Sequence, residues 1–277
     1  MNLRGFLISL GFVALATQAQ AGCANGGDAC KLADGEYHIA LPPGEVAAPP
    51  VVMFLHGAGG NGRSVIRNRG MVGALLRRGY AVIAPTGSRS FRGREAANWV
   101  FYPGWKGRDE ADFLQRVVAD AAARFGVDGH RVLLGGFSAG AFMVNYLACT
   151  APGAFAAYAP VSGGFWRPHP VACDGPVKLF HTHGWRDPTV PIEGRSLRAG
   201  QFVQGDIFAG LEIWRTANGC AGHNPSSYSE TGQFWRRKWD NCSPGSALEF
   251  AMFPGGHGVP NGWAGMVLDW FEDVTAQ

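Results

Sequence analysis

The sequence predicts an α/β fold, in which a mostly parallel central sheet is covered by helices on both faces. Continuous apolar runs such as residues 51–55 and 132–134 are typical of strands buried on both faces. Longer segments between them have helical periodicity, as in Phe113, Val117 and Ala121 at spacings of four. Strands that alternate with helices indicate a parallel sheet. Because 47% of the residues are hydrophobic and 16% are charged, a disordered chain is excluded.

The elements are expected in the following order. Strands are expected at 36–41, 51–55, 80–84, 131–134, 156–161, 177–181 and 248–253, and helices at 64–78, 108–125, 141–148, 203–218 and 263–274. An aromatic-rich loop at 86–107 separates the third strand from the second helix. No internal repeat or linker interrupts this pattern, so residues 22–277 are expected to form one domain.

Residues 1–21 have the pattern of a signal peptide. Arg4 precedes an apolar stretch at 6–16, and Ala19-Gln20-Ala21 is a small-x-small cleavage site. The apolar stretch is too short to span a bilayer, and no later segment is long enough, so no membrane span is expected. The sequence therefore predicts a secreted or periplasmic protein.

Six cysteines, all after the predicted cleavage site, support an oxidising compartment. Six cysteines allow 15 pairings, and the sequence alone does not choose among them. The simplest pairing is sequential, Cys23–Cys30, Cys149–Cys173 and Cys220–Cys242. No Cys-x-x-Cys pair is present, so disulfides are favoured over a zinc site and no metal is expected.

The net charge of +3 is small, and the basic residues are scattered apart from Arg236-Arg237-Lys238. Nucleic-acid binding needs a broader basic patch, so that partner is not expected. The cluster is interpreted as a solvated loop or strand edge.

Ser138 is the expected nucleophile. It lies in Gly136-Phe137-Ser138-Ala139-Gly140, directly after the apolar run that ends at Gly135 and before a run of small and apolar residues. Gly-x-Ser-x-Gly between a strand and a helix is the pattern of a nucleophile elbow. Such a turn holds the serine at a positive φ and exposes its hydroxyl.

An activated serine needs a base and an acid that orients the base. Asp187 follows the strand 177–181, and His257 follows the strand that ends at Phe253 within a glycine-rich loop. Both lie at carboxyl ends of strands, where the sites of parallel sheets form, and the order Ser, Asp, His is the one expected after such an elbow. The other histidines considered are placed less well, namely His38, His130, His169, His181, His183 and His223. His183 is interpreted as a structural residue beside the acid loop.

The oxyanion of the tetrahedral intermediate needs backbone N–H donors. Ala139, which follows the nucleophile, is the first candidate. The second is expected in the small-residue loop after residue 55, at Ala58, with Gly57 or Gly59 as the alternative. Three tryptophans are candidates for contact with the substrate: Trp185 beside Asp187, and Trp99 and Trp105 in the aromatic loop. For the aromatic loop, packing onto the body of the domain is an equally good explanation.

Several short segments, taken in order, resemble a known family. They are 55–60 (LHGAGG), 136–141 (GFSAGA), 159–163 (APVSG), 183–191 (HGWRDPTVP), 218–220 (NGC) and 255–257 (GGH). Together they resemble the secreted polyhydroxybutyrate depolymerase and feruloyl esterase-like branch of the α/β-hydrolases, from about residue 35 onward. The resemblance implies the triad Ser138, Asp187 and His257, and it implies disulfides Cys149–Cys173 and Cys220–Cys242.

The chain departs from that branch at a few positions. Phe137 stands where Met or Tyr is usual, Ala139 where Asn or Gln is frequent, and Gly258-Val259 where an aromatic residue and proline commonly follow the histidine. No Thr-rich linker or polymer-binding domain follows Gln277, so soluble esters or oligomers are expected rather than solid polymer.

The sequence therefore predicts a serine esterase that forms an acyl-enzyme and needs no cofactor. The expected substrate is a small-molecule or oligomeric ester, first of all a 3-hydroxybutyrate oligomer. The alternatives are a feruloyl or acetyl ester on plant polysaccharide, a small lipid-like ester, a peptidase with the same triad, and a non-catalytic binding protein on a hydrolase scaffold.

Overall fold

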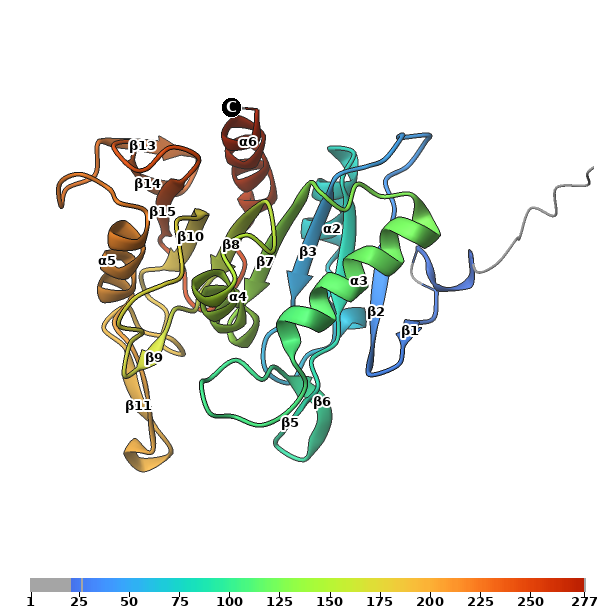
Figure 1. Ribbon diagram of the computed structural model, residues 1–277, viewed down its shortest axis with the longest axis horizontal. Coiled ribbons are helices and arrows are strands. Elements are labelled where there is room, and N and C mark those ends of the chain that lie inside the picture. The colour runs from blue at the N-terminus through green and yellow to red at the C-terminus, as the bar shows by residue number, and fades with distance from the viewer. Residues whose placement is uncertain (1–20, 26, 277) are drawn as a thin grey trace, which may run out of the picture.

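A computed structural model describes residues 21–25 and 27–276 of the chain (Figure 1). The signal peptide predicted at 1–21 lies outside the described residues, apart from its last position. The chain is organised around one large sheet. In spatial order its ten described strands are β1 (Cys30–Leu32), β2 (Gly35–Ala40), β4 (Ala81–Pro85), β3 (Val51–Leu55), β7 (Val132–Phe137), β8 (Ala157–Val161), β10 (Lys178–Gly184), β15 (Ala247–Phe253), β14 (Phe234–Trp239) and β13 (Ser227–Thr231).

The six central strands, from β4 to β15, are parallel, and antiparallel strands extend the sheet at both edges. Because β3, β4 and β8 are buried along their whole length, their sequences are continuous apolar runs rather than alternating patterns. The predicted fold class is therefore confirmed, with the carboxyl ends of the parallel strands meeting at one edge of the sheet (Figure 1).

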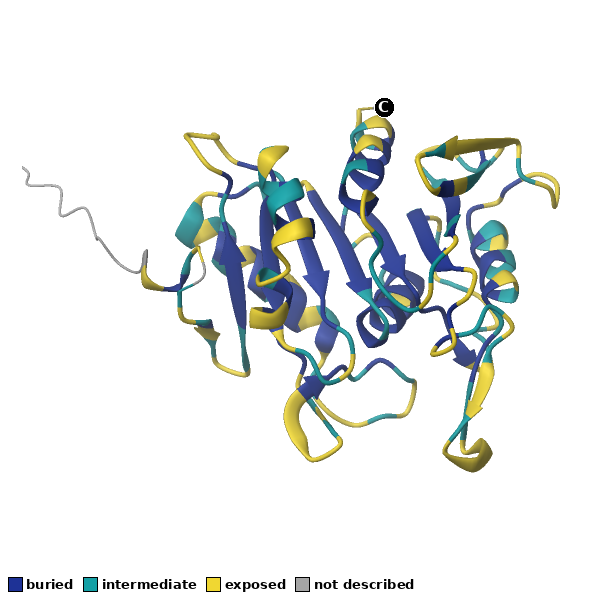
Figure 2. Cartoon of the chain, turned by 180° about the vertical axis from the view of Figure 1, so that it is seen from behind, coloured by how far each residue is buried: buried dark blue, intermediate teal, exposed yellow. Residues whose placement is uncertain are grey.

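Helices cover both faces of this sheet (Figure 1). One face packs against α3 (Glu110–Phe125), α4 (Ala139–Thr150) and α5 (Ile207–Ala217), and the other against α1 (Gly62–Ile66), α2 (Arg69–Arg77) and α6 (Trp263–Thr275). Each face has its own cluster of buried apolar side chains, and Figure 2 shows the central strands as the most deeply buried part of the chain.

Two small sheets and two short 3-10 turns complete the described fold. They are β5 (Arg89–Phe91) with β6 (Arg94–Asn98), β11 (Arg195–Leu197) with β12 (Phe202–Gln204) and β9 (Trp166–Arg167), and the turns η1 (Ala21–Cys23) and η2 (Arg198–Gly200). All of these strands follow carboxyl ends of central strands in the sequence, so they surround the edge where the site is expected.

The single helix predicted at 64–78 is wrong, because the segment forms two helices. α1 ends before Asn68, and the Asn68 side chain accepts a hydrogen bond from the Met71 amide (3.2 Å), which caps the start of α2. The helix predicted from residue 203 begins later, at Ile207. Asp206 caps it through the Ala209 amide (2.8 Å), and residues 202–204 form β12 instead.

The structure contains the three disulfides of the sequential pairing, Cys23–Cys30, Cys149–Cys173 and Cys220–Cys242. Cys149 lies in the last turn of α4, the helix that begins directly after Ser138. Three disulfides agree with an oxidising compartment. Among the described helices, none has the length and apolar character that crossing a bilayer requires.

Candidate active site

Ser138 occupies a sharp turn between β7 and α4. Its backbone has φ 56° and ψ −117°, the strained positive-φ conformation expected at a nucleophile elbow. The turn is possible only because glycines flank it closely. A Cβ at Gly140 would lie 2.7 Å from the carbonyl carbon of Leu55, and one at Gly136 would lie 2.6 Å from the Gly140 oxygen. Strand, turn and helix are therefore held together at van der Waals distance, and the hydroxyl is presented at the edge of the sheet.

Ser138, His257 and Asp187 are joined by hydrogen bonds. The His257 Nε2 lies 2.9 Å from the Ser138 Oγ, and its Nδ1 lies 2.7 Å from the Asp187 Oδ2. An ionised carboxylate only accepts, so the proton lies on Nδ1 and the lone pair of Nε2 faces the serine hydroxyl. The Phe137 ring packs against the imidazole with 4.6 Å between ring centroids. The arrangement is that of a base ready to take the serine proton.

Asp187 is buried, and both of its carboxylate oxygens are used. Oδ2 accepts from His257, while Oδ1 accepts from the amides of Thr189 (2.8 Å) and Val190 (2.9 Å). Burial by itself would raise the pKa of Asp187, but the hydrogen bonds from His257, Val190 and Thr189 outweigh it and lower that pKa below its usual value. Asp187 is therefore ionised at neutral pH.

A chain of hydrogen bonds from β10 supports the acid loop. His183 donates from Nε2 to the Val190 carbonyl (2.8 Å), and its Nδ1 lies 3.2 Å from the Nε2 of His181. Burial lowers the pKa of both histidines, that of His181 well below its usual value, so both are neutral and each can donate one proton and accept another. The structure places His183 beneath the acid loop, where the sequence had led us to expect a structural residue.

The loop after β3 is held by buried side chains. His56 donates from Nδ1 to the Gly57 carbonyl (2.8 Å) and accepts at Nε2 from the Gly87 amide (3.0 Å). Burial lowers the pKa of His56 to about 4, so the ring is neutral at physiological pH. The Trp99 indole donates to the His56 carbonyl (2.9 Å). These contacts fix the backbone at the point where the second oxyanion donor is expected.

The amide of Gly59 donates to the Ala97 carbonyl (2.8 Å), so it is not available to an oxyanion. Among the hydrogen bonds of the described residues, none uses the amide of Ala58 or that of Ala139. Ala139 is also the first residue of α4, and amides at a helix N-terminus favour negative charge. Both predicted donors therefore remain candidates, and of the two alternatives to Ala58 only Gly57 is left.

Comparison with known proteins identifies the family of the chain. The family described as Esterase PHB depolymerase matches residues 35–173, half of the chain. The chain belongs to this family. It is 27% identical to feruloyl esterase C of Emericella nidulans, over 82% of this chain and 78% of that protein. It is 32% identical to poly(3-hydroxyalkanoate) depolymerase C of Paucimonas lemoignei, over 46% of this chain, but it spans less than a third of that protein (31%).

Solved structures agree on the fold. Acetyl xylan esterase from Aspergillus awamori superposes with a TM-score of 0.62 at 17% identity, over 85% of this chain and 93% of that one. The Bacillus cereus carboxylesterase superposes with a TM-score of 0.56 at 15% identity, over 87% and 95%. The α/β-hydrolase fold implied by the sequence resemblance is confirmed, and the chain is an esterase of the Esterase PHB depolymerase family.

The three tryptophans named from the sequence differ in exposure. Trp99 is fully buried beneath the loop after β3, so its ring is not available to a substrate in this structure. Trp105 is partly buried in an aromatic cluster, with the Arg89 guanidinium 3.9 Å from its ring centroid. Trp185 is 56% exposed, two residues before Asp187, and its amide donates to the Phe253 carbonyl (3.1 Å).

Two residues of the site were missed in the sequence. His56 begins the small-residue loop in which the second oxyanion donor is expected. Its position directly after a buried strand could have indicated a role in the site. Gly87 carried no signal, because its contact with His56 joins two distant loops. Among the described residues, no group of three or more His, Cys, Asp or Glu side chains is placed to hold a metal ion.

Proposed function

We propose that this esterase works through the triad Ser138, Asp187 and His257 and forms an acyl-enzyme. The hydrogen bonds from Asp187 through His257 to the Ser138 hydroxyl carry the proposal. His257 takes the serine proton as Ser138 attacks the ester carbonyl, and returns it to the leaving alcohol. Asp187 stabilises the imidazolium that forms between these steps. Water then enters, loses its proton to His257, and releases the acid.

The amides of Ala139 and Ala58 are the proposed oxyanion donors. Ala139 begins a helix, and the Ala58 loop is fixed from behind by His56 and Trp99. Donors that are already fixed need no reorganisation as charge develops on the carbonyl oxygen, and one such donor contributes about 3–4 kcal/mol to the transition state.

The first proposed substrate is a 3-hydroxybutyrate oligomer. The family to which the chain belongs is described as Esterase PHB depolymerase, and a poly(3-hydroxyalkanoate) depolymerase is among the similar proteins. A depression of about 150 Å³ adjoins the elbow on the side of α1 and α2, with Gly57, Phe137 and Val259 in its lining. Ser138 and His257 do not line this depression, so its size sets no limit on the acyl group.

Esters on polysaccharide are the second candidate. The exposed Trp185 ring beside Asp187 favours them, since a flat aromatic surface near the acid suits a large, ring-bearing substrate. The names of two similar proteins, a feruloyl esterase C and an acetyl xylan esterase, point the same way. Disulfides in the structure support the proposal that the protein acts outside the cytosol.

The test is hydrolysis of three panels by the mature protein: soluble 3-hydroxybutyrate oligomers, acetylated xylan and methyl hydroxycinnamates. We expect turnover of short acyl esters, and a loss of about 10⁵–10⁶ in kcat for Ser138→Ala. Ser162→Ala is the matched control, because Ser162 also follows a strand at φ 56° and is fully buried. A preference for hydroxycinnamates would favour a feruloyl esterase over a depolymerase. Ester turnover by Ser138→Ala, or a wild-type protein that does not react with a fluorophosphonate probe, would refute the triad.

A further inference from the structure

A patch of exposed aromatic rings lies beside the catalytic edge of the sheet. Among the described residues, all four exposed large aromatic side chains gather there: Trp185 (56% exposed), Phe208 (40%), Tyr228 (69%) and Trp235 (39%). Trp185 and Trp235 meet edge to face, with 5.8 Å between ring centroids. Exposed aromatic rings that gather in one place usually mark a binding surface.

The strand register connects this patch to the catalytic acid. Glu230, Trp235, Met252 and His183 are successive partners across β13, β14, β15 and β10, so their side chains share one face of the sheet. His183 at the inner end of the row supports the loop of Asp187. Trp235, two strands out from His183 in this row, therefore lies on the same side of the sheet as the acid loop.

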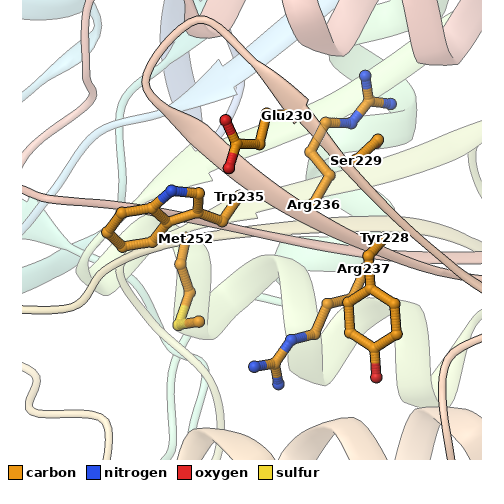
Figure 3. Close-up of a pocket in the computed structure, with 7 residues that line it drawn as sticks. All are labelled: Tyr228, Ser229, Glu230, Trp235, Arg236, Arg237 and Met252. Carbon is orange, nitrogen blue, oxygen red and sulfur yellow. The ribbon is translucent and has the colours of Figure 1, made fainter.

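The patch is hollowed into a groove. A first depression of about 410 Å³ lies over β13 and β14 (Figure 3), and a second of about 410 Å³ lies between these strands and α5. The two share Tyr228 and Arg237, so they adjoin. We call this surface the β13–β14 groove; its lining includes Tyr228, Glu230, Trp235, Arg237, Met252 and Trp239. At one end of the groove Trp235 contacts Trp185, which lies at the catalytic edge of the sheet.

The polar side chains in the groove have mixed character. Figure 3 shows Glu230 on one side of Trp235 and Arg237 beside Tyr228. Neither Glu230 nor Arg237 forms an ion pair with another residue in the described part of the chain, whereas Arg236 pairs with Glu249 on the other face of the strand. Glu212 and His223, which also line the groove, pair with each other (3.3 Å). The groove thus offers one carboxylate and one guanidinium that form no ion pair, beside flat rings, and the Arg237 guanidinium lies 5.9 Å from the centroid of the Phe208 ring.

We infer that the β13–β14 groove binds the backbone of a neutral polysaccharide. A sugar ring has C–H faces that pack on the negative faces of aromatic rings, and its hydroxyls both donate and accept. Hydroxyls therefore satisfy Glu230 and Arg237 together. A polyester chain has only acceptors, so it would leave the Glu230 carboxylate without a donor and partly desolvated. A charged polymer would be repelled by one of the two side chains.

A chain held in the groove passes Trp235 and Trp185 and reaches the loop of Asp187. Its ester substituents are thereby brought to the carboxyl edge of the sheet, where Ser138 lies. This last step rests on the proposed function, whereas binding of the chain itself requires no catalytic residue.

The test is affinity electrophoresis of the mature protein in gels that contain arabinoxylan freed of its esters by alkali. We expect retardation by the wild type and, equally, by Ser138→Ala. Trp235→Ala or Tyr228→Ala should raise the Kd about tenfold, as the loss of one aromatic stacking contact implies. Trp235→Phe, which keeps a ring, should restore most of the affinity. Val171→Ala is the control, since Val171 is an exposed apolar residue that does not line the groove.

Ester turnover is measured on the same samples, so that failure of the proposed groove can be distinguished from failure of the proposed triad. Active wild-type protein that is not retarded by arabinoxylan would refute the groove and leave the triad standing. Retardation that Trp235→Ala and Tyr228→Ala do not change would place the polysaccharide elsewhere and also refute it. Stronger binding to polyhydroxybutyrate granules than to arabinoxylan would show a polyester surface. A dimer in sedimentation that Tyr228→Ala dissociates would show that a second copy covers the groove.

Discussion

Replacement of Asp187 by asparagine tests the triad more sharply than its removal. Oδ1 of Asp187 accepts two backbone hydrogen bonds, from Thr189 and Val190, so in Asp187→Asn the amide oxygen is expected to take this position. The NH₂ group then faces His257 where Oδ2 stood, 2.7 Å from Nδ1. An NH₂ group donates, so the imidazole must accept at Nδ1 and carry its proton on Nε2. With a proton already on Nε2, His257 cannot accept the proton of the Ser138 hydroxyl.

The expected loss is about 10⁴ in kcat, the scale found when a triad imidazole is held in the wrong tautomer, which corresponds to about 5 kcal/mol of transition-state stabilisation. Initial rates with p-nitrophenyl acetate at pH 7.5 measure this loss in kcat. Ser138→Ala gives the residual rate without the nucleophile. The fold should persist, because the shape and the two loop hydrogen bonds are kept.

Asp206→Asn is the matched control. Asp206 also accepts an amide hydrogen bond, from Ala209 (2.8 Å), but as the cap of α5, where asparagine serves as well as aspartate. We expect this variant to keep full activity. If Asp187→Asn retains more than a tenth of the wild-type kcat with an unchanged melting temperature, then Asp187 does not orient His257 and the reasoning fails.

Three further predictions concern stability. Gly140→Ala should lower the melting temperature strongly, because its Cβ would lie 2.7 Å from the carbonyl carbon of Leu55 at the end of β3. The control is Gly265→Ala in α6, whose Cβ meets no atom within 4 Å and which should be neutral or stabilising by up to about 1 kcal/mol. Equal changes of melting temperature in the two variants would refute the close approach at Gly140. The pKa of His56 is about 4 in the folded protein and about 6.5 in the unfolded chain. The unfolded chain therefore takes up a proton first as the pH falls. The free energy of unfolding, which is at its full value above pH 6.5, should decrease by about 3 kcal/mol by pH 4. Urea unfolding of wild type and His56→Gln between pH 7.5 and 4 measures this, and an unchanged pH dependence in the variant would contradict it. Replacing Cys220 and Cys242 by alanine should lower the free energy of unfolding by about 3 kcal/mol, since their disulfide joins residues 22 apart; equal urea midpoints for the variant and the oxidised wild type would contradict this.

The parts of the fold that the sequence predicted best are those whose burial leaves a simple pattern. β3 was expected at 51–55 and is found there, because a strand covered on both faces needs an apolar side chain at every position. The relation of Ser138, Asp187 and His257 could be predicted because each follows a strand, and the carboxyl ends of parallel strands meet at one edge.

Elsewhere the decisive contacts are tertiary. The run Arg236-Arg237-Lys238 was interpreted as a solvated loop or strand edge and lies in β14, between two other strands. Arg236 points to the α6 side of the sheet, where it pairs with the buried Glu249, and Arg237 points to the opposite face. The run is therefore part of a strand with two different faces. Three adjacent charged residues hide this alternation in the sequence. The burial of Trp99 could not be predicted from the sequence either, because its indole donates to the carbonyl of His56, 43 positions earlier in the chain.

The two roles of the Asp187 carboxylate bear on how such a site can change over evolutionary time. In a lineage that moved its triad acid to another strand, an intermediate would have to lose this carboxylate before or after gaining the new one. Here any replacement other than asparagine would also strip the acceptor from the amides of Thr189 and Val190, and would loosen the turn that His183 supports. Relocation of the acid would therefore leave asparagine at this position or require a rebuilt loop. The identity of the residue is in this way tied to the shape of its own loop.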